Sequence, residues 1–165
     1  IKSISSLDIR SNIALVQQQP FLFSGKIIDV IKMGRKFSEE DVIKSAKISN
    51  AHKFIQKLPN KYETLISERG TNLSGGQIQR IAIARAIYRK PQILFLDEAT
   101  NALDINTEEK LLNNLFQDDI GYTIFLISHK LQALKRCNKI YLLNKQILQK
   151  VSFNELEKVL SAENL

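Results

Sequence analysis

The stretch that decides the fold is Ile93-Leu-Phe-Leu-Asp-Glu-Ala-Thr100, in which four apolar residues are followed at once by two carboxylates. A continuous apolar run is typical of a central strand in a parallel sheet, which is covered on both faces. Ligand sites in open parallel sheets lie at the carboxyl ends of the strands. Because adjacent strand residues point to opposite sides, Asp97 and Glu98 can serve two roles, one toward a metal and one toward a water molecule. A strand that simply ends at its first solvated acids fits the same pattern.

Outward from this stretch the chain has two regimes. Residues from about 24 to 90 are predicted to be mostly helical, with helices at 51–58 and 75–89 and a third that begins after the N-cap Ser38 and its three following acids. From residue 92 onward, strands alternate with helices, as a parallel α/β sheet requires. The strands are expected at 93–96, 123–127, 140–143 and 147–148, the second of them another buried strand, and the helices at 107–116 and 153–160.

The run Leu73-Ser-Gly-Gly-Gln77 directly precedes the most apolar predicted helix, at 75–89. Ser74 is a natural N-cap, and the two glycines allow a ligand to approach the backbone closely. The free N–H groups and the dipole of a helix make its N-terminus a site for anions. An ordinary capped helix after a flexible turn is the simpler interpretation of these residues taken alone.

Two further polar residues follow strand-like runs. His129 comes after the apolar run at 123–127, and Gln18 comes after Ile13-Ala-Leu-Val16. Because the carboxyl ends of parallel strands meet at one edge of a sheet, both side chains are expected near Asp97 and Glu98. A single histidine at the end of a strand is more often structural than functional.

Composition and charge exclude several classes of protein. The 165 residues carry a net charge of +7, but the 24 basic residues are spread along the chain without interleaved aromatic residues, which predicts a solvated surface and no nucleic-acid partner. The single cysteine, Cys137, excludes an internal disulfide framework and a cysteine-based zinc site. Two histidines are too few to support a metal site built from several histidines. No apolar run approaches the roughly 18 residues of a membrane helix.

The ordered combination of these segments is more specific than any one of them. The segments are Val16-x-Gln18-x-Pro20, 73–77, 93–100, Ala102-Leu-Asp104 and Ser128-His129. This set resembles the nucleotide-binding domain of ATP-binding cassette (ABC) proteins, whose Q-loop, signature motif, Walker B strand, D-loop and switch histidine it matches in turn. The resemblance implies an α/β fold, a RecA-like P-loop NTPase core at 1–23 and 91–165, joined to an α-helical signature subdomain at about 24–90.

The family's P-loop is not present in this sequence. The pattern Gly-x-x-x-x-Gly-Lys-Ser/Thr does not occur, since the single Gly-Lys pair, Gly25-Lys26, is followed by Ile27. The core is therefore expected to be incomplete at its N-terminus, with an unpaired sheet edge and an exposed apolar face, and residues 1–165 alone are expected not to hydrolyse ATP. Two smaller departures are Asn101, where the family usually has serine, and 144–146, where a glycine-bearing turn is usual and the late hairpin is expected to be tighter or out of register.

The resemblance also implies a role for each site residue, with ATP and Mg²⁺ as cofactors. Glu98, His129 and Gln18 would be catalytic, and Asp97 and Gln18 would hold Mg²⁺. Ser74, Gly75, Gly76 and Gln77 would contact the γ-phosphate of ATP bound to a partner subunit, and Asp104 would link the two sites. The implied assembly is a head-to-tail dimer, and the intact residues favour a homodimer.

The segments Phe21-Leu-Phe23-Ser24-Gly25 and Ser67-Glu-Arg-Gly70 resemble those of exporter-type cassettes. In that branch Glu68 and Arg69 contact a transmembrane domain, which implies ATP-driven export at the cytoplasmic face of a membrane, here a bacterial inner membrane. The exported substrate would be chosen by membrane helices outside this chain. Two alternatives remain open: a soluble ABC ATPase acting in translation or repair, and a truncated module that binds a partner without hydrolysis.

Overall fold

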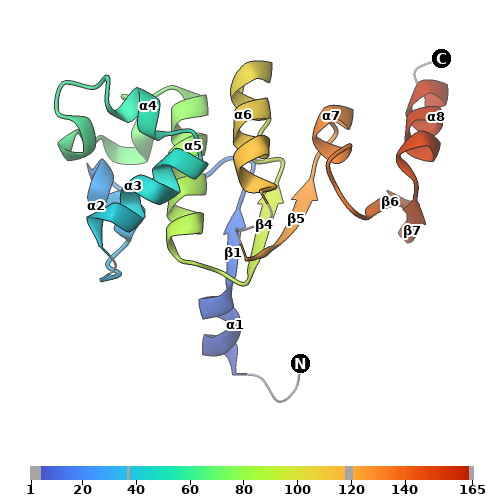
Figure 1. The fold of residues 1–165 in the computed structure, drawn as a ribbon, viewed down its shortest axis with the longest axis horizontal. Coiled ribbons are helices and arrows are strands. Elements are labelled where there is room, and N and C mark those ends of the chain that lie inside the picture. The colour runs from blue at the N-terminus through green and yellow to red at the C-terminus, as the bar shows by residue number, and fades with distance from the viewer. Residues whose placement is uncertain (1–4, 37, 118–120, 164–165) are drawn as a thin grey trace. The chain divides into compact units, whose positions relative to one another are not determined.

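The computed structural model describes residues 5–36, 38–117 and 121–163. The chain divides into two compact units, Ile1–Ile127 and Ser128–Leu165 (Figure 1). The first unit holds a parallel sheet and the helices that cover it. The second unit holds a short helix, a β-hairpin and a terminal helix.

The sheet of the first unit is built from strands β1 (Ile13–Val16), β4 (Ile93–Asp97) and β5 (Thr123–Ile127). The strands are parallel and lie side by side in the order β1-β4-β5, so that Val16 pairs with Leu96 and Asp97 with Ile127 (Figure 1). This register brings the carboxyl ends of the three strands to one edge of the sheet. The predicted parallel α/β sheet is confirmed.

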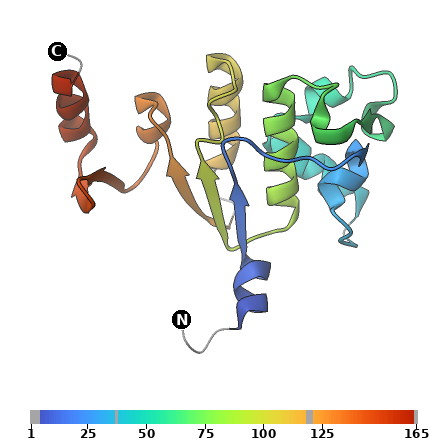
Figure 2. The same ribbon diagram turned by 180° about the vertical axis from the view of Figure 1, so that it is seen from behind.

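The two faces of this sheet differ. One face, which includes Ala14, Leu94 and Leu96, is buried by helices α5 (Gly75–Tyr88) and α6 (Ile105–Leu115). On the other face Leu15 and Phe125 are 56% and 50% exposed, and the Phe95 and Phe125 rings stack at 4.7 Å. Seen from behind in Figure 2, the strands lie in front of α6.

β4 lies between β1 and β5, so its predicted place as a central parallel strand is confirmed, although only one of its two faces is buried. The prediction that β5 is a buried strand is wrong for the described part of the chain. β5 is an edge strand of the described sheet, and its residues alternate between exposed and half-buried. The apolar runs predicted where the strands lie in the sequence. They did not predict which face of the sheet is covered, because alternate residues of a strand point to opposite faces. The expected unpaired edge and exposed apolar face are both seen among the described residues.

The predicted helical regime is confirmed between β1 and β4, and α1 (Ser6–Asn12) precedes β1. Strands β2 (Gly25–Lys26) and β3 (Leu65–Ile66) form a short antiparallel pair there. The helical elements are α2 (Ile27–Lys32), α3 (Glu39–Ile48), α4 (His52–Ile55), α5 and the 3₁₀ turns η1 (Lys61–Glu63) and η2 (Glu68–Gly70). Ser38 caps α3 as predicted, because its Oγ accepts the N–H of Asp41 at 3.2 Å.

The helix predicted at 51–58 is shorter than expected. α4 ends at Ile55, and the chain continues in turns in which Lys57 N–H donates to Phe54 O and Leu58 N–H to Ile55 O. Pro59 disfavours helical backbone only at Leu58, the residue before it, and so does not account for the end at Ile55. The division into a subdomain at 24–90 stays a prediction.

The second unit contains α7 (Leu131–Leu134), β6 (Ile140–Asn144), β7 (Ile147–Val151) and α8 (Phe153–Glu163). β6 and β7 pair antiparallel with Asn144 opposite Ile147, so a two-residue turn joins them in regular register. Lys145 and Gln146 both have positive φ, 45° and 67°, the backbone that glycine usually supplies in such hairpins. The hairpin is tight, as expected, and is not out of register. Among the helices of the described residues, none has the length and apolar character needed to cross a bilayer.

Candidate functional site

Glu98 lies at the edge where the three parallel strands end. β4 stops at Asp97, and Glu98 follows in a left-handed conformation with φ of 48°. The Glu98 N–H donates to Ile127 O at 3.0 Å, and the Glu98 carbonyl accepts the N–H of Asn101 at 3.1 Å. The expectation that the two acids alternate as successive strand residues is thus wrong for Glu98, because the turn after β4 sets its direction. Positive φ is costly for a residue with a side chain and persists where the surroundings hold it.

Two side-chain amides converge on the Glu98 carboxylate. Gln18 Nε2 donates to Glu98 Oε2 at 2.6 Å, and Asn101 Nδ2 donates to the same oxygen at 2.8 Å. The structure thus brings together Gln18 and Glu98, which are 80 residues apart in the chain. In the sequence, Asn101 stands out only as a departure from the family pattern, which does not predict its contact with Glu98. That departure was the one available signal.

Asp97 and the amide oxygen of Gln18 are the groups here that could face a cation. The described residues contain no cluster of three or more His, Cys, Asp or Glu side chains suited to a metal. Mg²⁺ is usually held by one or two carboxylates together with substrate phosphates. Since Gln18 uses its Nε2 for Glu98, its Oε1 is left to face an ion. The donor set therefore fits a Mg²⁺ ion shared with a phosphate and does not fit a cage made by this chain alone.

The N-terminus of α5 is closed by a capping box. Ser74 Oγ accepts the N–H of Gln77 at 3.3 Å, and Gln77 Oε1 accepts the N–H of Ser74 at 2.9 Å. The N–H groups of Gly75 and Gly76 have no acceptor within a helix at these positions. A fourteen-residue helix that presents two glycine N–H groups in its first turn can accept an anion at close range.

The two glycines differ in their surroundings. A Cβ built on Gly76 would lie 3.0 Å from the carbonyl oxygen of Ala102 and 3.4 Å from Leu103 Cδ2, whereas one on Gly75 would lie 3.8 Å from Ala102 Cβ. Of these two glycines, Gly76 is therefore the one packed tightly against the rest of the chain. Its absent side chain lets α5 approach the loop that follows Glu98 and Asn101.

Two side chains of α5 connect this helix to its neighbours. Buried Gln79 donates from Nε2 to the backbone oxygen of Gln17 at 3.3 Å. Arg80 donates to Gly76 O at 3.0 Å and to Asn50 O at 3.1 Å, and its guanidinium lies 4.6 Å from the centre of the Phe54 ring. The signature helix is thereby joined both to the loop that carries Gln18 and to the turn before α4.

Asp104 has a structural task in this chain. It is the N-cap of α6, with Oδ1 accepting the N–H of Thr107 at 2.9 Å. The hydrogen bonds from Thr107 lower the pKa of the Asp104 carboxyl, and the charge of Arg80 adds a smaller effect in the same direction. Its exposed side chain remains available for the predicted link to a partner subunit.

The remaining predicted residues are His129 in the second unit and Glu68 and Arg69 in the first. His129 is an exposed residue of the second unit, next to a turn in which Ser128 Oγ accepts the N–H of Lys130 at 3.0 Å, and its place near Glu98 stays a prediction. Glu68 and Arg69 lie in η2, both exposed, with Arg69 at φ of 57°. Hydrogen bonds from Asn72 Nδ2 to Leu65 O and between the hydroxyls of Ser67 and Thr71, each at 2.8 Å, hold this turn in shape.

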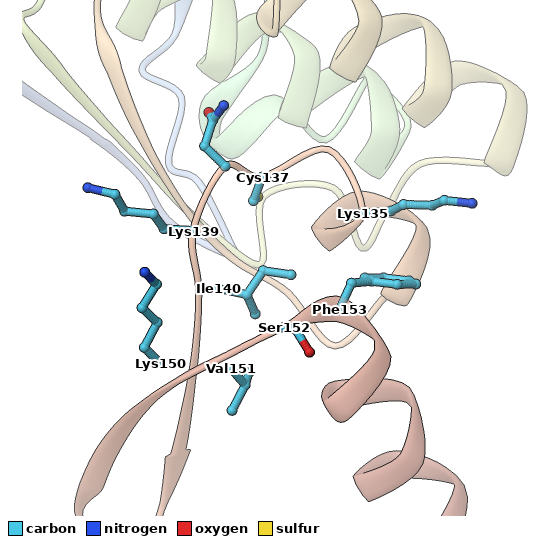
Figure 3. A pocket seen from close by; sticks show the side chains of 9 residues that line it. Lys135, Cys137, Lys139, Ile140, Lys150, Val151, Ser152 and Phe153 are labelled. Atoms are coloured by element: carbon cyan, nitrogen blue, oxygen red, sulfur yellow. The ribbon is translucent and has the colours of Figure 1, made fainter.

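Two surface cavities lie apart from these carboxylates. The cavity of about 360 Å³ in the second unit is lined by Cys137, Ile140, Phe153 and several lysines, and the amino groups of Lys139 and Lys135 point away from it (Figure 3). Burial raises the pKa of the Cys137 thiol, which keeps it in the less reactive neutral form. A cavity of about 330 Å³ beside Gln17 is mostly apolar, with half-buried Arg85 as its charged lining residue. Neither cavity has the convergent polar groups that the Glu98 edge offers.

A parallel α/β sheet with carboxylates at its C-terminal edge, together with a helix N-terminus that presents glycine N–H groups, is the arrangement of an α/β domain that binds nucleotides or other phosphate ligands. Comparison with known proteins agrees. The family model described as "ABC transporter" matches residues 1–101. The chain belongs to the ABC transporter family, as its ATP-binding part, and is homologous to B-family exporters.

Individual relatives give the same result. The chain is 47% identical over 150 residues to "ABC transporter B family member 15" of Arabidopsis thaliana, covering 90% of this chain and 12% of that protein. It is 45% identical over 158 residues to "Uncharacterized ABC transporter ATP-binding protein YknU" of Bacillus subtilis (strain 168), covering 94% and 27%. The solved "Structure of a bacterial Atm1-family ABC exporter with ATP bound" superposes with a TM-score of 0.88 at 34% identity, over 96% of this chain and 28% of that one. The chain thus spans about an eighth to a quarter of these relatives' lengths.

Proposed function

We propose that this chain is part of an ATPase domain that drives export of a substrate across a membrane. Export coupled to ATP hydrolysis is the activity of the family to which the chain belongs. The observation that carries the proposal is the contact between Gln18 and Glu98 at 2.6 Å, which places an amide and a carboxylate together at the carboxyl edge of the sheet. This is where a parallel α/β fold presents groups to a bound ligand.

Each residue at this edge has a task in phosphoryl transfer, which depends mainly on positioning and on stabilising charge. Glu98 orients and polarises the attacking water, since a carboxylate is a general base suited to that role. Gln18 sits against Glu98 and senses whether the water and the phosphate are in place. His129, carried by the second unit, contacts the γ-phosphate.

The residues that would hold Mg²⁺ are Asp97, through its carboxylate, and Gln18, through its amide oxygen. When bound, the ion neutralises charge on the β- and γ-phosphates. Asp97 is held at the end of β4, where its position is set by the pairing with Ile127 on β5. The carboxylates of Asp97 and Glu98 repel a bare triphosphate, so these residues favour the nucleotide with its cation.

The signature residues Ser74, Gly75, Gly76 and Gln77 act on the nucleotide of a second subunit. The N-terminus of α5 offers backbone N–H groups to a γ-phosphate, and its anion preference supports this role. The assembly is a head-to-tail homodimer, in which Asp104 links one site to the other. Its contact with a transmembrane domain runs through Glu68 and Arg69, which the turn at η2 leaves exposed. The ATPase works at the cytoplasmic face of the membrane.

The experiment that tests this function uses the full-length protein that contains this chain, reconstituted in lipid vesicles. We expect Mg-ATP-dependent phosphate release that stops when Mg²⁺ is chelated. We also expect ATP-dependent movement of solutes across the vesicle membrane. ATP hydrolysis in a protein that never joins a membrane would instead support a soluble ABC ATPase, and partner binding without any hydrolysis would support a non-hydrolysing module.

Residues 1–165 alone are a separate case, because they contain no P-loop sequence. The P-loop supplies the backbone N–H groups and the lysine that hold the β- and γ-phosphates. We expect this polypeptide to bind Mg-ATP with a Kd of about 1 mM, a free energy of roughly −4 kcal/mol, and to release no phosphate. Isothermal titration measures the first and a phosphate assay the second. A micromolar Kd would contradict the expectation.

A further inference from the structure

We propose that Asn101 is a positioning residue for Glu98, a task that rests on the proposed role of Glu98 in ATP hydrolysis. The Asn101 side-chain amide donates to Glu98 Oε2 at 2.8 Å, three residues away in the chain. A hydrogen bond from a neutral amide to a carboxylate is charge-assisted and stronger than one between neutral groups. Asn101 thereby fixes the direction in which the carboxylate points.

Asn101 contacts Glu98 through its backbone as well. The N–H of Asn101 donates to the Glu98 carbonyl at 3.1 Å, on the opposite side from the Glu98 N–H, which donates to Ile127 O at 3.0 Å. These bonds hold Glu98 at its φ of 48°. Asn101 therefore holds both the backbone and the side chain of Glu98 in position, and β5 holds the backbone as well.

The other amide on this oxygen belongs to Gln18, which has a second proposed task toward the metal and the water. Gln18 lies in the loop after β1 and comes from a distant part of the sequence, whereas Asn101 shares a tight turn with Glu98. Asn101 therefore keeps Oε2 in place whenever the Gln18 side chain turns toward the nucleotide.

The reach of asparagine matters at this position. A serine hydroxyl branches directly from Cβ and lies closer to the backbone than Nδ2 of asparagine, so it does not reach the same point without a shift of the turn. Asparagine in place of the usual family serine at position 101 therefore changes how the Glu98 carboxylate is held.

The test compares Asn101→Ala and Asn101→Asp in the reconstituted full-length protein. The alanine removes the donor, and the aspartate replaces it with a second carboxylate of the same shape. We expect kcat for ATP hydrolysis to fall by about tenfold in Asn101→Ala and by about tenfold to a hundredfold in Asn101→Asp. We expect KM for ATP to stay within about twofold. The matched control is Asn60→Asp, an equal charge change at an exposed asparagine outside the site, which should leave both constants unchanged.

A double variant separates positioning from a general structural effect. In the Glu98→Gln background, Asn101→Asp should cause less than a twofold further loss, because the group it positions is already disabled. A full further loss, or equal kcat in Asn101→Asp and the unchanged protein, would overturn the inference. Unchanged kcat in Glu98→Gln itself would overturn the proposed function instead, so the two failures are distinguishable.

Discussion

The Glu98 edge of the sheet and the N-terminus of α5 are two regions of this chain that, in the proposed dimer, act on different nucleotides and by different means. At the Glu98 edge the working groups are side chains, a carboxylate with amides of Gln18 and Asn101 on one of its oxygens. At the α5 N-terminus the working groups are backbone N–H groups, exposed because Gly75 and Gly76 have no side chains. The Glu98 edge therefore depends on which side chains are present, whereas the α5 N-terminus depends on the lack of side chains at the two glycines.

This difference predicts different sensitivities to mutation. A side-chain group is lost by an isosteric change that leaves the fold intact, since only charge or donor capacity is altered. A backbone site is lost by adding atoms or charge, and at Gly76 the added atoms also meet Ala102.

Glu98→Gln is expected to give the largest effect, because it removes the negative charge and keeps the shape. In the full-length protein, ATP hydrolysis should fall by about a hundredfold to ten-thousandfold, with ATP binding retained. Phosphate release and equilibrium nucleotide binding are the two measurements. Glu109→Gln, the same change at an exposed position on α6, is the matched control. Near-normal turnover in Glu98→Gln would show that another group polarises the water.

Gly75→Asp and Gly76→Asp are expected to lower ATP hydrolysis by about tenfold or more through repulsion between the new carboxylate and the γ-phosphate. Nucleotide binding by a single open subunit should survive in both. Gly76→Asp should in addition lower the thermal stability, since its Cβ approaches the Ala102 carbonyl at 3.0 Å, whereas Gly75→Asp should not. Activity, single-subunit affinity and melting temperature are measured side by side. A collapse of single-subunit affinity would mean that residues 74–77 act within their own subunit.

Ser74→Ala and Ser38→Ala compare two N-caps with the same geometry. Ser74 caps α5 and Ser38 caps α3, each by accepting an N–H three residues on. Each substitution should cost about 0.5–2 kcal/mol of unfolding free energy. Only Ser74→Ala should also reduce ATP hydrolysis, because only that helix faces the proposed nucleotide. Equal activities in the two variants would assign Ser74 a capping role alone.

Asp104 gives the smallest expected effect, a change with pH. The cap hydrogen bonds from Thr107 lower the pKa of Asp104 below its usual 3.8, so its carboxylate stabilises the folded state above that pH. This contribution should be lost as the pH falls through the lowered pKa. In Asp104→Asn the cap is kept without the charge, so the unfolding free energies of the two proteins should converge on acidification. Denaturant unfolding at neutral and acidic pH measures this, and a difference that grows at low pH would contradict it.

Much of the fold could be predicted from local patterns. The apolar run before Asp97 defined β4, the acids after Ser38 defined the start of α3, and Ser74 with its glycines defined the start of α5. These features depend on interactions within a few residues, which sequence reports directly. The length of α4 and the exposure of β5 were predicted wrongly. Tighter turns follow Ile55, and β5 lies at the edge of the described sheet, and neither of these follows from a local pattern.

The sequence by itself determined the family and the identity of the chemical groups, since Gln18, Asp97, Glu98 and the 73–77 run occur in an ordered pattern. Only the tertiary structure decided how they meet. Nothing local shows that Gln18 and Asn101 share one oxygen of Glu98, or that Gly76 is required by Ala102. Strand pairing brings Gln18 to Glu98 across 80 residues, and the packing of α5 against the loop after β4 brings Gly76 to Ala102. Asn101 is three residues from Glu98, and the geometry of the turn after β4 directs its side chain to the carboxylate. Side-chain orientation at a turn depends on such packing, and therefore lies beyond any local pattern.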